Sequence, residues 1–202
     1  MTSMLWDLRL AYANGAFPMG DESGTVDWYT SLERAVFPIT GIRVSRSMQR
    51  TLNRGGIEIR FDTAFEQVMR GCIRPKDNWI NEELIRVYVD AFREGWGHSC
   101  EVWMDDNLVG GVYGVAIGAC FCAESMFHRR TDMSKVALWA MVNRCRELGF
   151  VLFDAQVMNP HLESLGALSL SPAQYMVQLR QAMQKWTDWS GPPFDYDALR
   201  SS

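Results

Sequence analysis

The sequence has no excess of basic residues. Its 202 residues include 20 Lys and Arg against 24 Asp and Glu, which gives a formal net charge of −4. Proteins that hold nucleic acid through their overall charge are basic, so the composition gives no general case for RNA binding. Any RNA site on this chain must be a local patch.

Long apolar runs are also missing. Residues 1–7 lack the basic segment and apolar stretch of a signal peptide, and no run of 18 uncharged apolar residues follows. We therefore expect a cytoplasmic protein without a membrane segment. The hydrophobic content of 48% is enough for one ordinary core, or for a small domain that leans on a larger one.

The cysteine patterns of zinc ribbons and redox motifs are absent. The chain has five cysteines, none in a CxxC pair, and its three histidines are scattered along the sequence. Cys120 and Cys122 stand too close together for a usual zinc loop. We expect buried thiols at all five positions and no metal site (Cys72, Cys100, Cys120, Cys122, Cys145).

The local patterns predict a mixed fold. A helix is expected from Asn81 to Gly95, followed by three strands at residues 99–104, 108–116 and 120–125 that read as an antiparallel meander. A second helix is expected from Ser134, as its N-cap, to Leu148, and a short strand follows at residues 150–157.

Two further helices are marked by their first residues, Asn159-Pro160 and the capping-box sequence Ser171-Pro172-Ala173-Gln174. Together these elements indicate an α+β fold. Linker-like composition occurs only at residues 20–24, which could bound a small N-terminal unit, and at residues 190–193.

Asp154 and Gln156 are the most informative polar residues. They are two positions apart in an otherwise apolar strand, which puts their side chains on the same face, where they could touch one common ligand. Burying a carboxylate and an amide is costly unless both are hydrogen-bonded, so they need either structural partners or a polar cleft. Glu124, at an expected strand end, is open to the same two interpretations.

A series of motifs resembles the leucyl/phenylalanyl-tRNA–protein transferases, in that family's order. The match is closest from about residue 79 to residue 167. The motifs that carry it include Phe17-Pro18, Ser45-Arg46-Ser47-Met48, Trp79-Ile80, Glu101-Val102-Trp103, Glu124-Ser125-Met126-Phe127, Ser134-Lys135, Asp154-Ala155-Gln156 and Ser164-Leu165-Gly166-Ala167.

The resemblance implies a small N-terminal domain, at residues 1–40, and a larger acetyltransferase-like (GNAT-like) domain, at residues 41–202. It implies a monomeric enzyme that needs neither metal nor coenzyme. The implied reaction moves leucine or phenylalanine, with methionine as a further candidate, from charged tRNA to an N-terminal Arg or Lys of an acceptor protein. That transfer would mark the acceptor for N-end-rule degradation.

The resemblance also implies roles for single residues. Gln156 would position the attacking amine, Asp154 would orient and polarise the Gln156 amide, and Glu124 would form a second polar wall. The candidates for binding the donor are Trp79, Ser125, Met126, Phe127 and Met141. The candidates for contact with tRNA phosphate are Arg43, Arg46, Arg50 and Arg54, the last three of which could line one helical face.

Some positions depart from the family pattern. Met19 stands where tryptophan is frequent, and residues 29–33 replace a run usually read Trp-Ser-Pro-Asp-Pro. Ala123 replaces a glycine and Ala155 a cysteine, and both small residues should leave the strands intact.

Two other functions compete with aminoacyl transfer. The first is an acyl-CoA-dependent N-acetyltransferase, but residues 109–114 lack the basic residue and glycine spacing expected of a pyrophosphate loop. The second is a non-catalytic module that binds basic protein N-termini through Glu124 and Asp154.

Overall fold

Three long strands joined by short turns form the centre of the fold. In the computed structural model, which describes residues 3–21, 23–76 and 78–200, these are β5 (Gly97–Met104), β6 (Asn107–Ile117) and β7 (Cys120–His128). Asp105 and Asp106 both have positive φ (49° and 57°), as a two-residue hairpin turn requires. The predicted antiparallel meander is confirmed, with each strand longer than expected.

The meander is extended on both sides into a seven-stranded sheet. The strand order is β4-β5-β6-β7-β8-β3-β9. Strand β8 (Leu152–Val157) runs parallel to β7 and is reached through helix α5 (Met133–Glu147), whereas all other pairs are antiparallel. The added strands β4 (Glu58–Phe61), β3 (Arg34–Phe37) and β9 (Leu168–Leu170) complete an α+β fold.

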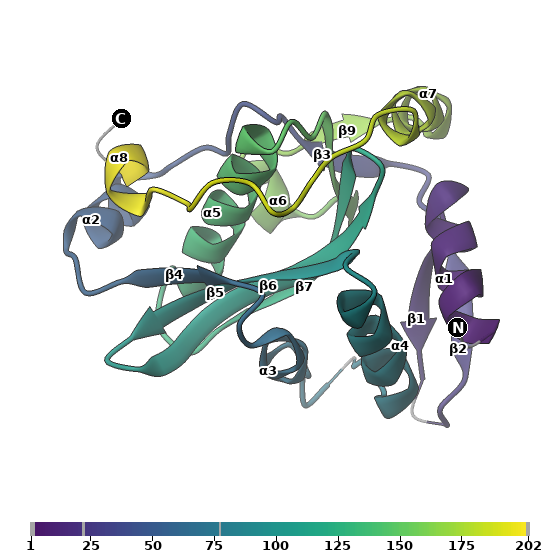
Figure 1. Ribbon diagram of the computed structural model, residues 1–202, viewed down its shortest axis with the longest axis horizontal. Helices are drawn as coiled ribbons and strands as arrows, with labels where there is room; N and C mark the ends of the chain where they lie inside the picture. Colours follow the sequence, from purple (N-terminus) through teal and green to yellow (C-terminus); the bar gives the residue numbers. More distant parts are fainter. Residues whose placement is uncertain (1–2, 22, 77, 201–202) are drawn as a thin grey trace.

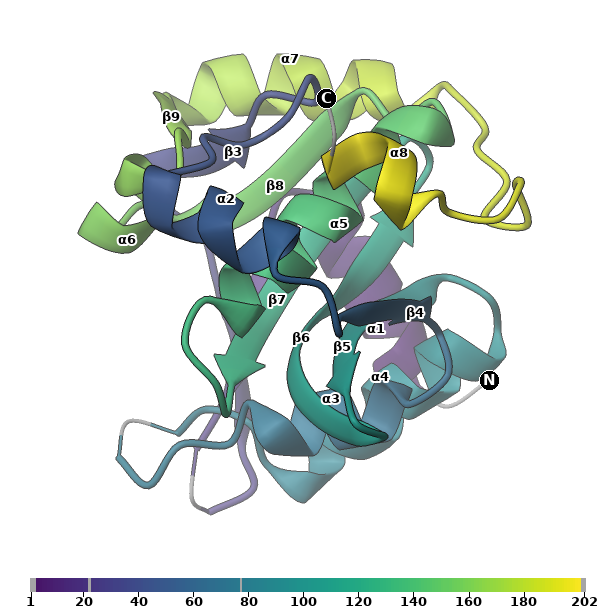
Figure 2. The same cartoon turned by 90° about the vertical axis from the view of Figure 1, so that its left-hand side faces the viewer.

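Helices cover both faces of the sheet (Figures 1 and 2). One apolar cluster joins the sheet to α5, α2 (Arg46–Asn53) and α6 (Pro160–Ser164), and the short α8 (Tyr196–Arg200) packs beside α2. The other cluster joins the opposite face to α1 (Ser3–Ala13), α3 (Phe65–Gly71), α4 (Glu82–Arg93) and α7 (Pro172–Met183). The sheet is therefore buried on both sides, which explains the many apolar residues in its strands.

A small N-terminal region packs against this sheet-rich domain. It consists of α1 and a ribbon of two antiparallel strands, β1 (Phe17–Gly20) and β2 (Val26–Tyr29). The Gly20 N–H donates to the Trp79 carbonyl at 2.9 Å, and a Cβ on Gly20 would come within 2.4 Å of the Asn81 side chain. The ribbon is thus held tightly to the segment that precedes α4. The predicted linker at residues 20–24 is the connection of this ribbon, with Glu22 outside the described residues.

Three predicted helix starts are confirmed and one is wrong. Asn81, Asn159 and Ser171 cap α4, α6 and α7 through their side chains, and Ser171 forms the predicted capping box with Gln174. Helix α5, however, begins after Asp132, whose φ of 68° makes the sharp turn out of β7, and Ser134 lies inside the first helical turn. A pattern of residue types cannot show this turn, because Ser is itself a favoured cap.

All five cysteines are buried and unpaired, as predicted. Among the described residues, no helix is long and apolar enough to cross a membrane.

Candidate functional site

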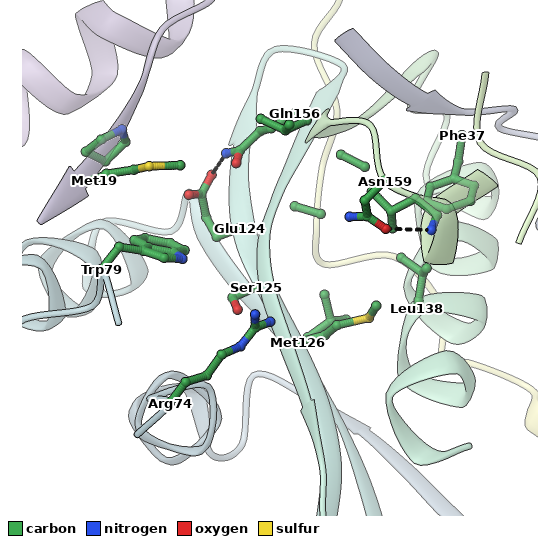
Figure 3. A pocket seen from close by; sticks show the side chains of 16 residues that line it. Met19, Phe37, Arg74, Trp79, Glu124, Ser125, Met126, Leu138, Gln156 and Asn159 are labelled. Atoms are coloured by element: carbon green, nitrogen blue, oxygen red, sulfur yellow. Dashed lines mark hydrogen bonds between the residues drawn. The ribbon is translucent and has the colours of Figure 1, made fainter. Parts of the chain in front are cut away.

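A cavity of about 230 Å³ opens where β7, β8, the N-terminal ribbon and the segment before α4 meet. Figure 3 shows Glu124 and Gln156 in its middle, with Met19 and Trp79 on one side and Met126, Leu138 and Phe37 on the other. The remaining lining residues are Pro18, Arg74, Val112, Ala123, Ser125, Ala155, Val157, Asn159 and Leu162. The cavity therefore combines an apolar wall with a small group of polar side chains.

Glu124 is held by three side chains. The Tyr12 hydroxyl donates to Oε1 at 2.5 Å, the Tyr88 hydroxyl to Oε2 at 2.9 Å, and the Gln156 Nε2 to Oε1 at 2.7 Å. Burial raises the pKa of Glu124 to about 7. The three hydrogen bonds oppose burial and lower the pKa, whereas the nearby charge of Asp154 adds to the increase. The carboxyl group thus titrates close to neutral pH.

Gln156 reaches this position through an irregularity in its strand. The pairing of β8 with β3 shifts between Ala35 and Val36, so that Ala155 is left without a partner. Gln156 itself has a φ of 61°. This left-handed conformation costs a side chain other than glycine about 1 kcal/mol or more, and such strain is typical of functional sites.

Asp154 does not line the cavity. It is fully buried and pairs with Arg34 through two hydrogen bonds of 2.8 and 2.6 Å, and it accepts a third from the Tyr175 hydroxyl at 2.9 Å. It also accepts the backbone N–H of Gln156 at 2.9 Å. Of the two interpretations left open by the sequence, Asp154 has structural partners, and only Gln156 lines the cavity. Asp154 fixes the Gln156 backbone, whereas the Gln156 side-chain amide is bound by Glu124.

The Asp154 network ties distant segments together. Arg34 also donates to the Gly15 carbonyl at 2.9 Å, at the turn between α1 and β1, while Tyr175 belongs to α7. An ion pair in such a buried position needs every partner, because an unpaired buried charge is strongly destabilising. The strained Gln156 backbone is thus supported from β3, α1 and α7 together.

The predicted donor-binding residues are only partly together. Trp79, Ser125 and Met126 line the cavity. Phe127 lies outside it, with its ring so close to Gly71 that a Cβ there would come within 2.8 Å. Met141, in α5, is fully buried in the core.

Leu138 takes the place expected for Met141, one turn earlier in α5. The spacing of three residues puts Leu138 and Met141 on the same face of the helix, but only Leu138 lies in the turn that reaches the cavity. Tyr12 and Tyr88 were missed entirely, since nothing in their local sequence distinguishes them from other core tyrosines.

The four predicted phosphate contacts are all exposed. Arg46 and Arg50 lie on α2 and Arg54 is its C-cap, so the helix that would align these three is present, whereas Arg43 precedes it. In the part of the chain that the structure describes, none of the four forms an ion pair. The same described residues contain no group of three or more His, Cys, Asp or Glu side chains that could hold a metal ion.

Known proteins match the chain over nearly its whole length. Residues 36–180 match the leucyl/phenylalanyl-tRNA protein transferase family, and residues 5–32 match the N-terminal domain of the same family. A leucyl/phenylalanyl-tRNA–protein transferase from Chlorobaculum tepidum is 44% identical over 184 residues, which cover 89% of this chain and 95% of the relative. One from Paramagnetospirillum magneticum is 46% identical over 197 residues, covering 94% and 93%.

The cavity and these matches place the chain in the class of aminoacyltransferases. It belongs to the leucyl/phenylalanyl-tRNA protein transferase family.

Proposed function

We propose that this protein transfers leucine or phenylalanine from charged tRNA to the N-terminal Arg or Lys of acceptor proteins, which marks them for degradation. The observation that carries the proposal is the Glu124–Gln156 pair in the middle of a cavity with an apolar wall, in a chain of this family. A cavity with an apolar wall and few polar groups suits one apolar side chain attached to a polar ester.

The apolar wall is the proposed donor pocket. Phe37, Val112, Met126, Leu138 and Leu162 would surround the side chain of the aminoacyl group. Burial of an aliphatic or aromatic side chain there is favourable by about 25 cal/mol for each Å² removed from water. Trp79, on the other side of the polar pair in Figure 3, would stack on the terminal adenine, a contact of about 1–3 kcal/mol.

Gln156 is the proposed positioning group for the reaction. The acceptor's α-amine attacks the ester carbonyl carbon, the amide bond forms, the bond to the ribose oxygen breaks, and the amine's proton ends on that oxygen. Since Nε2 of Gln156 donates to Glu124, Oε1 remains as the amide's acceptor for the amine N–H. An amide is a weak base, so Gln156 acts by orientation, with its backbone fixed by Asp154.

Glu124 is the proposed recognition group for the acceptor. A cationic side chain that enters a partly desolvated site gains more from a carboxylate than it would in water. The exposed arginines 43, 46, 50 and 54 are the proposed contacts for tRNA phosphate.

We also propose an acetyltransferase-like (GNAT-like) fold for the sheet, in the two-part organisation of residues 1–40 and 41–202. Its support is the antiparallel run β4 to β7, followed by α5 and the parallel strand β8. Strand β3, in the first part, contributes to the sheet of the second. A monomer in the cytoplasm completes the proposal.

Transfer of label from leucyl-tRNA to an Arg-initiated peptide tests this function. We expect the label on the peptide's α-amine, and none on the same peptide after acetylation. Absence of transfer, together with calorimetric binding of acetyl-CoA, would replace this function by N-acetylation. Peptide binding that leaves charged tRNA intact would point to a non-catalytic module.

A further inference from the structure

A second hollow of about 520 Å³ adjoins the catalytic cavity. The two share Arg74 and Met126 among their lining residues. In Figure 3 the Arg74 side chain extends from the end of α3 toward Ser125, at the boundary between them. The proposed reaction does not use this second hollow.

Four basic side chains, each from a different segment of the chain, line the second hollow. Arg74 follows α3, His128 ends β7, Lys135 lies in the first turn of α5, and His161 in the first turn of α6. The charges are close enough to act on one another, since burial first and then Lys135 and His128 lower the pKa of His161. Such a gathering is notable in a chain of net charge −4.

The carboxylate that lines this hollow offsets the charge of Lys135 and leaves Arg74 without an ion-pair partner among the described residues. Asp132 is already bound by Lys135 at 2.8 Å, and its other oxygen accepts from Ser47 and Thr51 at 3.3 Å each. Like charges that converge around a solvent-filled hollow repel one another unless an anion lies between them.

A third hollow, of about 390 Å³, continues from the second. It shares Thr131 and Asp132 with it and is lined by Arg50, Arg54 and Arg130. The three hollows therefore follow one another from Glu124 to the arginines of α2. Along the three hollows, the acidic Glu124 of the catalytic cavity is followed by basic side chains in the second and third hollows, whose charge Asp132 offsets only in part.

We infer that the second hollow, at Arg74, His128, Lys135 and His161, binds the phosphodiester groups that follow the terminal adenosine of the donor RNA. This inference rests on the proposed function. With the adenosine beside Trp79, the strand would pass Arg74 into the hollow and continue toward Arg50 and Arg54. The acceptor peptide does not fit there, because its cationic terminus would meet the positive charges of Arg74 and Lys135.

A comparison of donors with and without phosphate tests this subsite. Leucyl-adenosine has no phosphodiester, whereas the leucylated trinucleotide CCA has two. In a Lys135→Met, His161→Gln variant, we expect kcat/KM for the leucylated trinucleotide to fall about tenfold, and that for leucyl-adenosine to change less than twofold. Lys185→Met is the matched control, since Lys185 is exposed near the start of β7, at the end opposite to His128.

Binding of uncharged CCA gives a second readout that does not depend on turnover. The slope of log affinity against log salt should decrease by roughly 1 in the variant relative to the Lys185→Met control. Equal losses for both donors, or an unchanged salt slope, would overturn the subsite. If the wild-type protein transfers leucine from neither donor nor from leucyl-tRNA, both the proposed function and the subsite are overturned. If the wild-type protein transfers leucine but the variant loses activity equally with both donors, only the subsite is overturned.

Discussion

The hydroxyl oxygens of Tyr12 and Tyr88 lie 2.5 Å apart, although the two residues belong to α1 and α4. Each hydroxyl also contacts a different oxygen of Glu124, so the three side chains make three mutual contacts. Both hydroxyls donate to the carboxyl group, which favours its ionised form and lowers its pKa. Burial has the larger and opposite effect, so the pKa is raised to about 7.

Selection of a cationic acceptor should depend on pH through Glu124. Because burial raises the pKa of this carboxyl to about 7, it is mostly neutral below that pH and mostly ionised above it. The ratio of kcat/KM for an Arg-initiated peptide to that for its citrulline analogue should rise about tenfold as pH increases through 7. The analogue keeps the shape and the α-amine, so titration of the amine cancels in the ratio.

In Glu124→Gln the same ratio should be low and flat with pH. The other groups that face Glu124 are Tyr12, Tyr88, Tyr113 and Asp154. Burial raises the pKa values of the three tyrosines well above the usual value for tyrosine, so they do not titrate near pH 7. A pH-dependent ratio that survives in Glu124→Gln would assign the selection to another group.

Removal of the Tyr88 hydroxyl should move this pH dependence. The hydrogen bond from Tyr88 favours the ionised form of Glu124, so Tyr88→Phe should raise the carboxyl's pKa and shift the midpoint of the selectivity curve to a higher pH. Tyr113→Phe is the matched control, because the buried Tyr113 hydroxyl has no hydrogen-bond partner among the described residues. Equal midpoints in Tyr88→Phe and Tyr113→Phe would show that Tyr88 has no such role.

Gln156 should be needed for the rate of transfer rather than for folding. Gln156→Ala is expected to lower transfer at least ~10-fold, which corresponds to about 1.4 kcal/mol of barrier. Gln156→Gly separates the side chain from its strained backbone, since glycine adopts a φ of 61° freely. Single-turnover rates of the two variants should agree; full activity in either would remove Gln156 from the mechanism.

Asp154 should contribute to stability as well as to transfer. Asp154→Asn leaves Arg34 buried beside a neutral amide, so we expect the free energy of unfolding to fall by about 3–5 kcal/mol in urea titrations, with impaired transfer. The double variant Arg34→Met, Asp154→Leu should recover much of the stability, but not the hydrogen bond to the Gln156 backbone. Wild-type stability in Asp154→Asn would contradict this interpretation.

Local signals in the sequence were sufficient for the elements from α4 to α6 and for α7, but no pattern predicted strands β1 to β4 and β9 or helices α1 and α3. The caps at Asn81, Asn159 and Ser171, and the turns of the meander, are determined by neighbouring residues, and the structure has them where the patterns place them. The start of α5 after Asp132 was not predictable, because it depends on the left-handed backbone conformation of Asp132 in the turn after β7.

The site was less accessible to sequence reasoning. Glu124 and Gln156 meet across parallel strands, and the alternation of residues does not give the distance between them. The shift of register at Ala155 is set by pairing with β3, more than a hundred residues away. Tyr12 joins Glu124 over a comparable separation of 112 residues.

The contacts among Arg34, Asp154 and Tyr175 have a consequence for the order in which the enzyme is synthesised and folded. Their contacts need α7 in place, while Glu124 needs the hydroxyl from α1. As the chain emerges during synthesis, residue 12 appears early and residue 175 late, so the contacts that support Gln156 can all form only after α7 has been made. Activity therefore reports that nearly the whole chain has been made and folded.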